Sequence, residues 1–100
     1  MLLLIEKIEQ WAHDRNLIDG ATPQAQMLKM TEEVGELAHA IARKDISKSI
    51  DAIGDCVVVL AILSAQLKLS LPECVAAAYG QIKDRKGKMV NGVFIKEENV

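Results

Sequence analysis

Cysteine is scarce in this sequence, and the two cysteines present form no pattern that holds a metal. Cys56 and Cys74 stand alone in apolar surroundings, with no Cys-x-x-Cys motif and no cysteine-histidine spacing of a metal site. Isolated cysteines of this kind are typical of reduced thiols in the core of a cytoplasmic protein. We therefore expect two buried free thiols and a cytoplasmic location.

Long apolar segments and an excess of basic residues are also missing. Met1–Ile5 are followed at once by Glu6, so the apolar stretch is too short for a secretory leader. The longest apolar run, Cys56–Leu63, is far below the roughly 18–20 residues that cross a bilayer. The 12 basic and 14 acidic side chains give a net charge of -2, which excludes a protein that coats nucleic acid through a broad positive field. A small charged ligand remains open.

No internal repeat, low-complexity segment or linker divides the 100 residues, of which 50% are hydrophobic. We therefore expect residues 1–100 to form one soluble domain. A chain of this size buries only about 60–65% of the surface that its unfolded form exposes, which favours completion by further copies as a homodimer or homotetramer. Because no glycine-rich phosphate loop is present, any phosphate must be bound through a metal and side chains.

Apolar residues recur at helical spacing in four segments. The pattern predicts helices over about residues 2–15, 23–43, 47–68 and 70–86. Thr22 before Pro23 is typical of a helix start, and Ser70 with Glu73 matches a capping box. Four helices with short connections predict an all-α four-helix bundle, completed by oligomerisation.

The faces of these helices are predicted from the same spacing. The expected core face of the second helix consists of Met27, Met30, Val34, Leu37, Ala38 and Ile41, which leaves its glutamates on the flank and the far side. The third helix is apolar all round from Val57 to Leu63, so other elements must surround it. Asn91-Gly92 predicts a short hairpin-like tail, which we expect to pack on the helices because a two-stranded ribbon is marginal alone.

Five carboxylates fall into two groups at helical spacing, namely Glu32, Glu33 and Glu36 on the second helix and Asp51 and Asp55 on the third. Residues three or four positions apart on a helix are neighbours, so each group can present oxygens to one divalent cation or a close pair. Such cations usually bring phosphates with them. Gly35 and Gly54 are unfavourable in helix interiors, and they predict that the two helices approach closely there.

Simpler explanations exist for most of these acids. The three glutamates also fit the solvated face of an amphipathic helix, and Asp51 fits the preference of helix starts for acidic side chains. Asp55 fits this preference less well, because it lies further along the helix beside apolar residues. A buried unpaired carboxylate costs several kcal/mol, so the two aspartates need partners or a metal.

The segments Glu32-Glu33-Val34-Gly35-Glu36-Leu37 and Asp51-Ala52-Ile53-Gly54-Asp55, followed by an apolar helix, resemble the MazG-like nucleotide pyrophosphohydrolases, an all-α family. The resemblance extends to residues 11–16, 82–88 and 92–97. It implies Mg²⁺-dependent hydrolysis of ribo- or deoxyribonucleoside triphosphates to the monophosphate and pyrophosphate, with Mn²⁺ as a substitute cation. Cleansing of the nucleotide pool is the role that the family suggests.

The acidic motifs of that family are Glu-x-x-Glu on one helix and Glu-x-x-Asp on the next. Glu33 and Glu36 match the first motif and Asp55 matches the end of the second, whereas Ala52 stands at the position of its glutamate. The resemblance therefore assigns Glu33, Glu36 and Asp55 to the metal. Asp51, one turn before Asp55, is the expected substitute ligand, and we expect Asp51→Ala to remove most activity.

Catalytic and phosphate-binding residues are predicted with alternatives. Either Glu32 or Glu33 is the expected general base, and the sequence does not decide between them. A basic cluster that includes Lys83, Arg85 and Lys86 either contacts phosphates or only complements the dipole at the end of its helix. Within the first alternative Arg85 is the residue suited to a bidentate phosphate contact.

Base recognition is predicted from fewer signals. Trp11, one of three aromatic residues, either stacks on a base or joins the core, and its spacing from Leu4 and Ile8 favours the core. Asn16 is a candidate for reading a base edge. His13 and His39 are expected on the surface, because their spacing does not suggest a metal pair.

Two functions other than catalysis remain open. Ala52 favours a non-catalytic helical oligomerisation or regulatory module that binds a metal or a nucleotide without turning it over. A purely structural bundle explains the apolar third helix but neither Asp55 nor the two glycines. Stabilisation by Mg²⁺ or Mn²⁺ separates these accounts, because a purely structural bundle predicts none.

Overall fold

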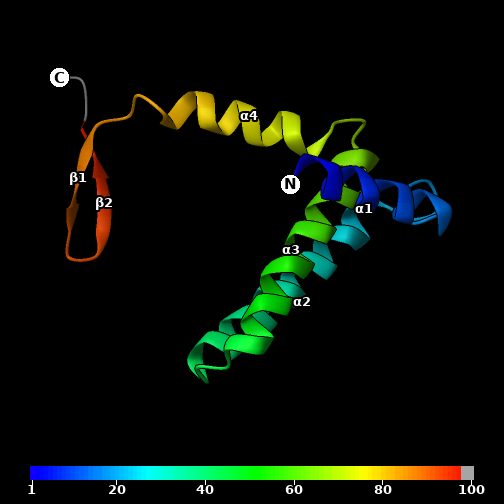
Figure 1. Ribbon diagram of the computed structural model, residues 1–100, viewed down its shortest axis with the longest axis horizontal. Helices are drawn as coiled ribbons and strands as arrows, with labels where there is room; N and C mark the ends of the chain where they lie inside the picture. Colours follow the sequence, from blue (N-terminus) through cyan, green and yellow to red (C-terminus); the bar gives the residue numbers. More distant parts are fainter. Residues whose placement is uncertain (98–100) are drawn as a thin grey trace.

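The computed structural model describes residues 1–97, and it is all-α with a short antiparallel hairpin near the carboxyl end (Figure 1). The helices are α1 (Leu2–Asp14), α2 (Pro23–Ala42), α3 (Ile46–Gln66) and α4 (Leu71–Ile82), and the strands are β1 (Gly87–Val90) and β2 (Val93–Lys96). The predicted all-α class with a short hairpin-like tail is confirmed.

Helix starts follow local sequence signals. Thr22, Asp45 and Ser70 are the N-cap residues of α2, α3 and α4, and the side chain of each accepts a hydrogen bond from the backbone N–H three residues later. The predicted bounds agree within about two residues, except that α4 ends at Ile82 instead of near residue 86. The apolar spacing stops at Ile82, and the four charged residues after it gain nothing from a longer helix because no neighbour packs against them.

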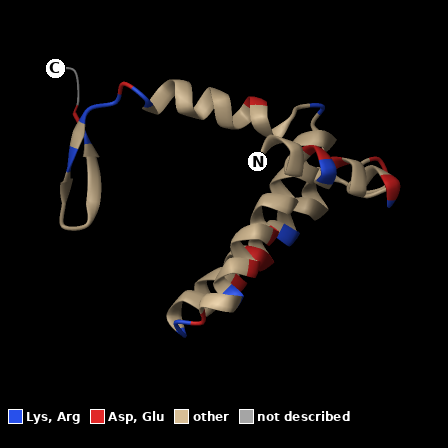
Figure 2. Cartoon of the chain, viewed as in Figure 1, with Lys and Arg blue, Asp and Glu red and all other residues tan. Residues whose placement is uncertain are grey.

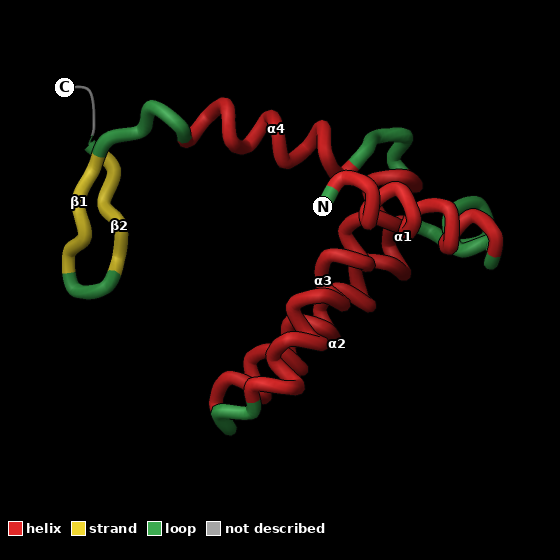
Figure 3. The backbone as a smooth tube through the Cα atoms, viewed as in Figure 1, coloured by secondary structure: helices red, strands yellow, loops and turns green. Residues whose placement is uncertain are grey.

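The helices α2 and α3 form an antiparallel pair that contains most of the contacts between helices (Figure 3). Their buried and half-buried side chains recur at alternating steps of four and three residues, namely Gln26, Met30, Glu33, Leu37 and Ala40 on α2 and Ser49, Ala52, Cys56, Val59 and Leu63 on α3. This is the seven-residue repeat of a coiled coil. We call this row of side chains the seam, and Glu33 is part of it.

The predicted core face of α2 is only partly right for the single chain, because Met30 and Leu37 belong to the seam but the rest of that face does not. Met27, Val34 and Ile41 are 50%, 49% and 61% exposed, whereas Glu33, expected on the flank, is 5% exposed. Because α2 carries two neighbouring stripes with the same seven-residue period, spacing alone does not decide which stripe meets α3. The stripe of Met27, Val34 and Ile41 remains uncovered in this chain, and the stripe that contains Glu33 forms the seam.

The apolar core is small and lies where α1 crosses the carboxyl-terminal half of α3. One cluster joins Ile5, Ala61 and Leu71, and a second joins Ala12, Ile18 and Ile62. The prediction that α3 is surrounded therefore holds only for this half, because Ile46, Ile50 and Ile53 near its start are exposed. No large side chain among the described residues is completely buried.

The hairpin forms as predicted, but it does not pack on the helices. Asn91 and Gly92 have φ angles of 50° and 79°, the left-handed geometry of a two-residue hairpin turn. Every residue of β1 and β2 is exposed, and neither strand contacts a helix of this chain. The helix α4 carries the hairpin away from the α2–α3 pair (Figure 1), so the expected packing is wrong for a single chain.

Other predictions about small residues also fail. A methyl group added at Gly35 or Gly54 would meet no atom within 4 Å, so these glycines do not mark a close approach of the two helices. Cys74 is exposed and Cys56 is half-buried, so the two thiols are free but are not core residues.

Among the described residues, no helix has by itself the length and apolar content to cross a membrane; α3 and α4 meet that criterion only jointly, with a bend of 103° between them.

Candidate metal centre

Three carboxylates from two helices converge beside the seam. Glu33 and Glu36 on α2 and Asp55 on α3 each offer one oxygen, and these oxygens all lie within 4.8 Å of one another. Glu33 belongs to the seam, Glu36 lies one turn further along α2, and Asp55 precedes the seam residue Cys56 on the facing helix. We call these three residues the carboxylate triad. The hypothesis that Glu36 and Asp55 lie close together is confirmed.

Glu33 is the most constrained member of the triad. It is 5% exposed, and its Oε2 atom is buried with no hydrogen-bond partner among the described residues. A buried carboxylate oxygen without a donor is unfavourable unless a positive charge lies close to it. The unpartnered oxygen therefore points to a cation.

The donor set of the triad fits Mg²⁺ or Mn²⁺. Octahedral Mg²⁺ with metal–oxygen distances of about 2.1 Å places its ligand oxygens about 3–4 Å apart. The triad oxygens need only small movements to reach this spacing, and Glu36 and Asp55 are exposed and free to rotate. Three carboxylates without nitrogen or sulfur donors are the ligand chemistry of a hard cation.

Lys29 forms ion pairs with Glu32 and Glu33. Its Nζ atom lies 3.4 Å from Oε1 of Glu33, one turn away, and 3.5 Å from Oε2 of Glu32. The hydrogen bond to Glu33, followed by the charge of Glu32, raises the pKa of Lys29 above its ordinary value. The ammonium group lies beside Oε1 of Glu33, so Oε2 still lacks a donor among the described residues.

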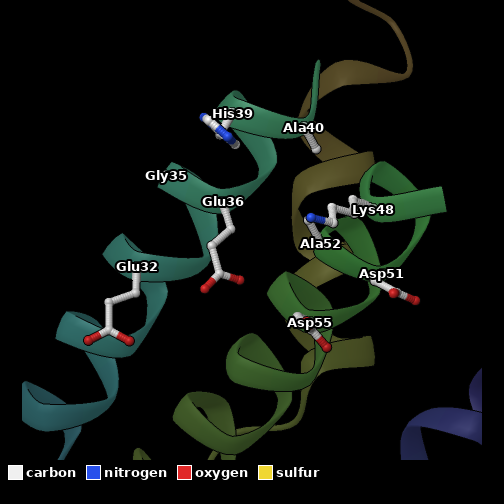
Figure 4. A pocket seen from close by; sticks show the side chains of 9 residues that line it. All are labelled: Glu32, Gly35, Glu36, His39, Ala40, Lys48, Asp51, Ala52 and Asp55. Carbon is white, nitrogen blue, oxygen red and sulfur yellow. The ribbon is translucent and has the colours of Figure 1, made fainter. Parts of the chain in front are cut away.

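A pocket of about 640 Å³ opens beside the triad between α2 and α3 (Figure 4). Its lining consists of Glu32, Gly35, Glu36, His39 and Ala40 from α2 and Lys48, Asp51, Ala52 and Asp55 from α3. Glu36 and Lys48 extend into the space between the helices, whereas the carboxylate of Asp51 points away from α2. Asp51 therefore lines this pocket without belonging to the triad.

A second pocket, of about 410 Å³, lies on another side of the same carboxylates. Trp11 lines it together with Lys29, Glu33 and Asp55, and its remaining lining is mostly apolar. Trp11 is 43% exposed, and the guanidinium of Arg15 lies 4.6 Å from the centre of its ring. The expected core position of Trp11 is therefore wrong, and its ring faces a pocket. Asn16 lines neither of these two pockets.

The predicted basic residues are not brought to the triad by their own chain. Lys83, Arg85 and Lys86 follow the far end of α4 (Figure 2). Within residues 1–97 neither α4 nor the hairpin contacts α2. The same chain therefore does not place these cations against its own carboxylates.

Sequence reasoning missed three residues beside the carboxylates, and helical spacing was the available signal. Lys29 precedes Glu33 by one turn, Lys48 precedes Asp51 and Ala52 by one turn, and His39 follows Glu36 by one turn. Side chains at these separations are neighbours on a helix. His39 is exposed as expected, but it lines the pocket beside the triad.

Comparison with known proteins points to one family. The family model of the MazG nucleotide pyrophosphohydrolase domain matches residues 21–90, from the start of α2 to the end of β1. A stretch of 63 residues is 51% identical to the uncharacterized 18.2 kDa protein in the rep-hol intergenic region of Haemophilus phage HP1 (strain HP1c1). The match covers 63% of this chain and 39% of that protein, so the chain spans well under two thirds of its relative. No solved structure gives a significant match.

Proposed function

The chain belongs to the MazG nucleotide pyrophosphohydrolase family, and we propose that it hydrolyses ribo- or deoxyribonucleoside triphosphates to the monophosphate and pyrophosphate with Mg²⁺ as cofactor. The carboxylate triad is the observation that carries this proposal, because three acids from two helices bring oxygens within 4.8 Å of one another and one of them, Glu33, has a buried oxygen without a hydrogen-bond partner. The family supplies the reaction, and the triad supplies the ligand set that the reaction requires. Mn²⁺ is the expected substitute cation.

The residues divide into ligands and a base. Glu33, Glu36 and Asp55 hold the cation, which when bound neutralises phosphate charge and positions water. Glu33 is buried and committed to the triad, whereas the side chain of Glu32 is 66% exposed and lines the pocket. We assign the general base to Glu32: it takes the proton as the water oxygen bonds to the α-phosphorus and the bond to the leaving pyrophosphate breaks.

The two pockets suggest how a nucleotide lies across the triad. Lys48 offers a positive charge in the larger pocket, where the triphosphate binds under this proposal. Trp11 offers an aromatic face in the smaller, more apolar pocket, which suits the base. The triad lies between these pockets, so the α-phosphate is the part of the nucleotide nearest to the carboxylates.

A panel of ribo- and deoxyribonucleoside triphosphates tests the reaction. Each is incubated with the protein and Mg²⁺, and the products are separated by anion-exchange chromatography. We expect the nucleoside monophosphate and pyrophosphate in equal amounts, with no reaction in EDTA. Release of inorganic phosphate and a nucleoside diphosphate would contradict the proposal, because it would place the cut between the β and γ phosphates.

Asp51 is the proposed replacement for the glutamate that the family has at the position of Ala52. The carboxylate of Asp51 reaches the site after a rotation of the side chain and then serves as the missing ligand. We therefore expect Asp51→Ala to lower turnover by about tenfold or more. In the same background, Ala52→Glu returns a carboxylate to the buried side of the pocket and is expected to restore turnover. Steady-state rates are compared for variants with unchanged helical circular dichroism. Near wild-type turnover of Asp51→Ala would show that Asp51 is only a helix-start acid.

Ala52 also supports a second candidate function. The side chain is buried in the seam and lines the pocket, so the position where the family carries a charged ligand is apolar in this chain. A protein that binds Mg²⁺ and a nucleotide without cleaving it would fit this substitution. Tight nucleotide binding with no product in the panel would favour this alternative over catalysis.

A further inference from the structure

The two pockets beside the triad follow one another along the α2–α3 pair. On these helices, the smaller pocket is lined within residues 25–33 and 55–62, and the larger pocket within residues 32–40 and 48–55. Because the two helices are antiparallel neighbours (Figure 3), these ranges place the pockets on opposite sides of the triad along the pair. A long ligand can therefore extend from Trp11 in the smaller pocket, past the carboxylates, to the far end of the larger pocket.

The far end of the larger pocket carries a positive charge. Lys48 extends there from α3 toward α2, whereas Glu32, Glu36 and Asp55 lie toward the other end (Figure 4). Lys48 precedes Asp55 by seven residues on α3, which corresponds to about 10.5 Å along the helix. Lys48 also lies in the first turn of α3, where the helix dipole favours anions. An anionic group at this end of the pocket is therefore attracted by the ammonium group and by the start of the helix.

Lys48 is available to a ligand, whereas the other lysine beside the triad is not. Lys29 already pairs with Glu32 at 3.5 Å and with Glu33 at 3.4 Å, and Lys48 forms no ion pair within residues 1–97. The backbone N–H of Lys48 donates a hydrogen bond to the N-cap side chain of Asp45, which fixes the backbone at this position. The amine at the end of the flexible four-carbon side chain remains free to meet an anion from solution.

Ala52 separates the lysine from the triad without adding a charge. It lies one turn after Lys48 and three residues before Asp55, its side chain is 4% exposed, and it lines the larger pocket. A glutamate at this position would place a further negative charge between the triad and Lys48 and repel an anion there. Because the alanine is uncharged, phosphate groups can follow the pocket from the triad to the lysine.

We propose that Lys48 binds the terminal phosphate of the nucleotide and thereby selects nucleoside triphosphates over diphosphates, a role that rests on the proposed function. With the base in the Trp11 pocket and the α-phosphate at the triad, the β and γ phosphates extend along the larger pocket toward Lys48. A diphosphate bound in the same way ends one phosphate earlier and loses this contact. Lys48 is therefore a specificity-determining residue that contacts the pyrophosphate part of the substrate.

Binding of analogues that resist cleavage tests this role without reference to activity. Analogues of ATP and dUTP with a methylene group between the α and β phosphates, and the matching analogues of ADP and dUDP, are titrated into the protein in Mg²⁺ by isothermal calorimetry. We expect Lys48→Gln to weaken triphosphate binding by about tenfold, as for the loss of a hydrogen bond between charged groups at an exposed side chain. Binding of the diphosphate analogues should stay almost unchanged.

Two further variants control this measurement. Lys48→Arg keeps the positive charge and should keep the preference for the triphosphate. Lys7→Gln is the matched control, because Lys7 is exposed on α1 and lines neither pocket beside the triad, and it should bind all four analogues as the wild type does. Equal weakening of triphosphate and diphosphate binding in Lys48→Gln, or weakening of neither, would overturn the proposal. Failure of the wild type to bind any of the four analogues would overturn it as well.

An affinity label tests where the terminal phosphate lies. Adenosine diphosphopyridoxal carries an aldehyde near the position of the γ-phosphate of ATP; the aldehyde condenses with a nearby lysine amine to an imine with loss of water, and borohydride reduces the imine to a stable amine. Mass spectrometry of peptides should identify Lys48 as the main labelled residue, with protection by the ATP analogue, and pyridoxal phosphate alone gives the background. Protected labelling of Lys29, or of Lys83 and Lys86, in place of Lys48 would contradict the placement.

Turnover separates this inference from the proposed function. Cleavage of triphosphates by the wild type, together with an unchanged preference for triphosphate over diphosphate in Lys48→Gln, would reject the role of Lys48 and leave the proposed function standing. Absence of turnover in the wild type, together with triphosphate binding that depends on Lys48, would reject the proposed function and leave the role of Lys48 standing.

Discussion

Asp55→Asn is expected to lower kcat/KM for triphosphate hydrolysis by at least about 100-fold. Loss of a residue that only supports a metal ligand typically costs about 10–100-fold, and Asp55 is proposed to be a ligand itself. It is the sole member of the triad that comes from α3, so its loss removes the contribution of one entire helix. The asparagine keeps the shape and removes the charge.

Asp19→Asn is the matched control for this variant. Asp19 is exposed in the turn between α1 and α2 and lines neither pocket beside the triad, so the same loss of charge should change turnover by less than about twofold. Because Asp55 is itself exposed, its variant should unfold at the same urea concentration as the wild type or a higher one. Equal turnover of the two variants would remove Asp55 from the site.

Glu33→Gln is expected to have opposite effects on stability without and with the metal. In EDTA the variant should be more stable than the wild type by about 1 kcal/mol, because the substitution removes a buried charge and its repulsion from Glu36 and Asp55. For a domain of this size, that difference raises Tm by about 4–8 °C. The loss of the ion pair with Lys29 offsets little, since Lys29 is largely exposed.

In saturating Mg²⁺ the order should reverse. A cation at 100 times its Kd stabilises the protein that binds it by about 2.7 kcal/mol, and only the wild type keeps the full ligand set. The wild type should therefore melt at a lower temperature than Glu33→Gln in EDTA and at a higher temperature in Mg²⁺. Glu32→Gln is the control, because Glu32 is exposed and outside the triad, and its melting should follow the wild type in both conditions. A less stable Glu33→Gln in EDTA would show that the buried charge is already compensated.

Local signals in the sequence were sufficient for most helix and strand bounds and for the approach of Glu36 to Asp55. The caps at Thr22 and Ser70 and the turn at Asn91-Gly92 act within a few residues, so they are readable without tertiary structure. The meeting of Glu36 with Asp55 was also predictable, since a short turn makes α2 and α3 antiparallel neighbours and fixes which turns face one another.

Local signals did not predict which stripe of α2 packs against α3, nor which contacts are made between chains. Glu33 and Val34 are adjacent in sequence and belong to two stripes of equal period, and nothing local decides that the glutamate is buried and the valine exposed. The hairpin was expected on the helices because it needs a neighbour, but the sequence does not tell whether that neighbour belongs to the same chain. The position of Lys83–Lys86 relative to the carboxylates depends on this same choice.

Titration with Mn²⁺, followed by the electron paramagnetic resonance signal of the free ion, tests most directly whether the carboxylate triad is a metal centre. Saturable binding of one or two ions per chain is expected for the wild type, with binding lost or strongly weakened in Glu36→Gln and unchanged in the Asp19→Asn control. Binding that is absent in the wild type, or equal in Glu36→Gln, would contradict the account and leave the acids as a solvated helix face.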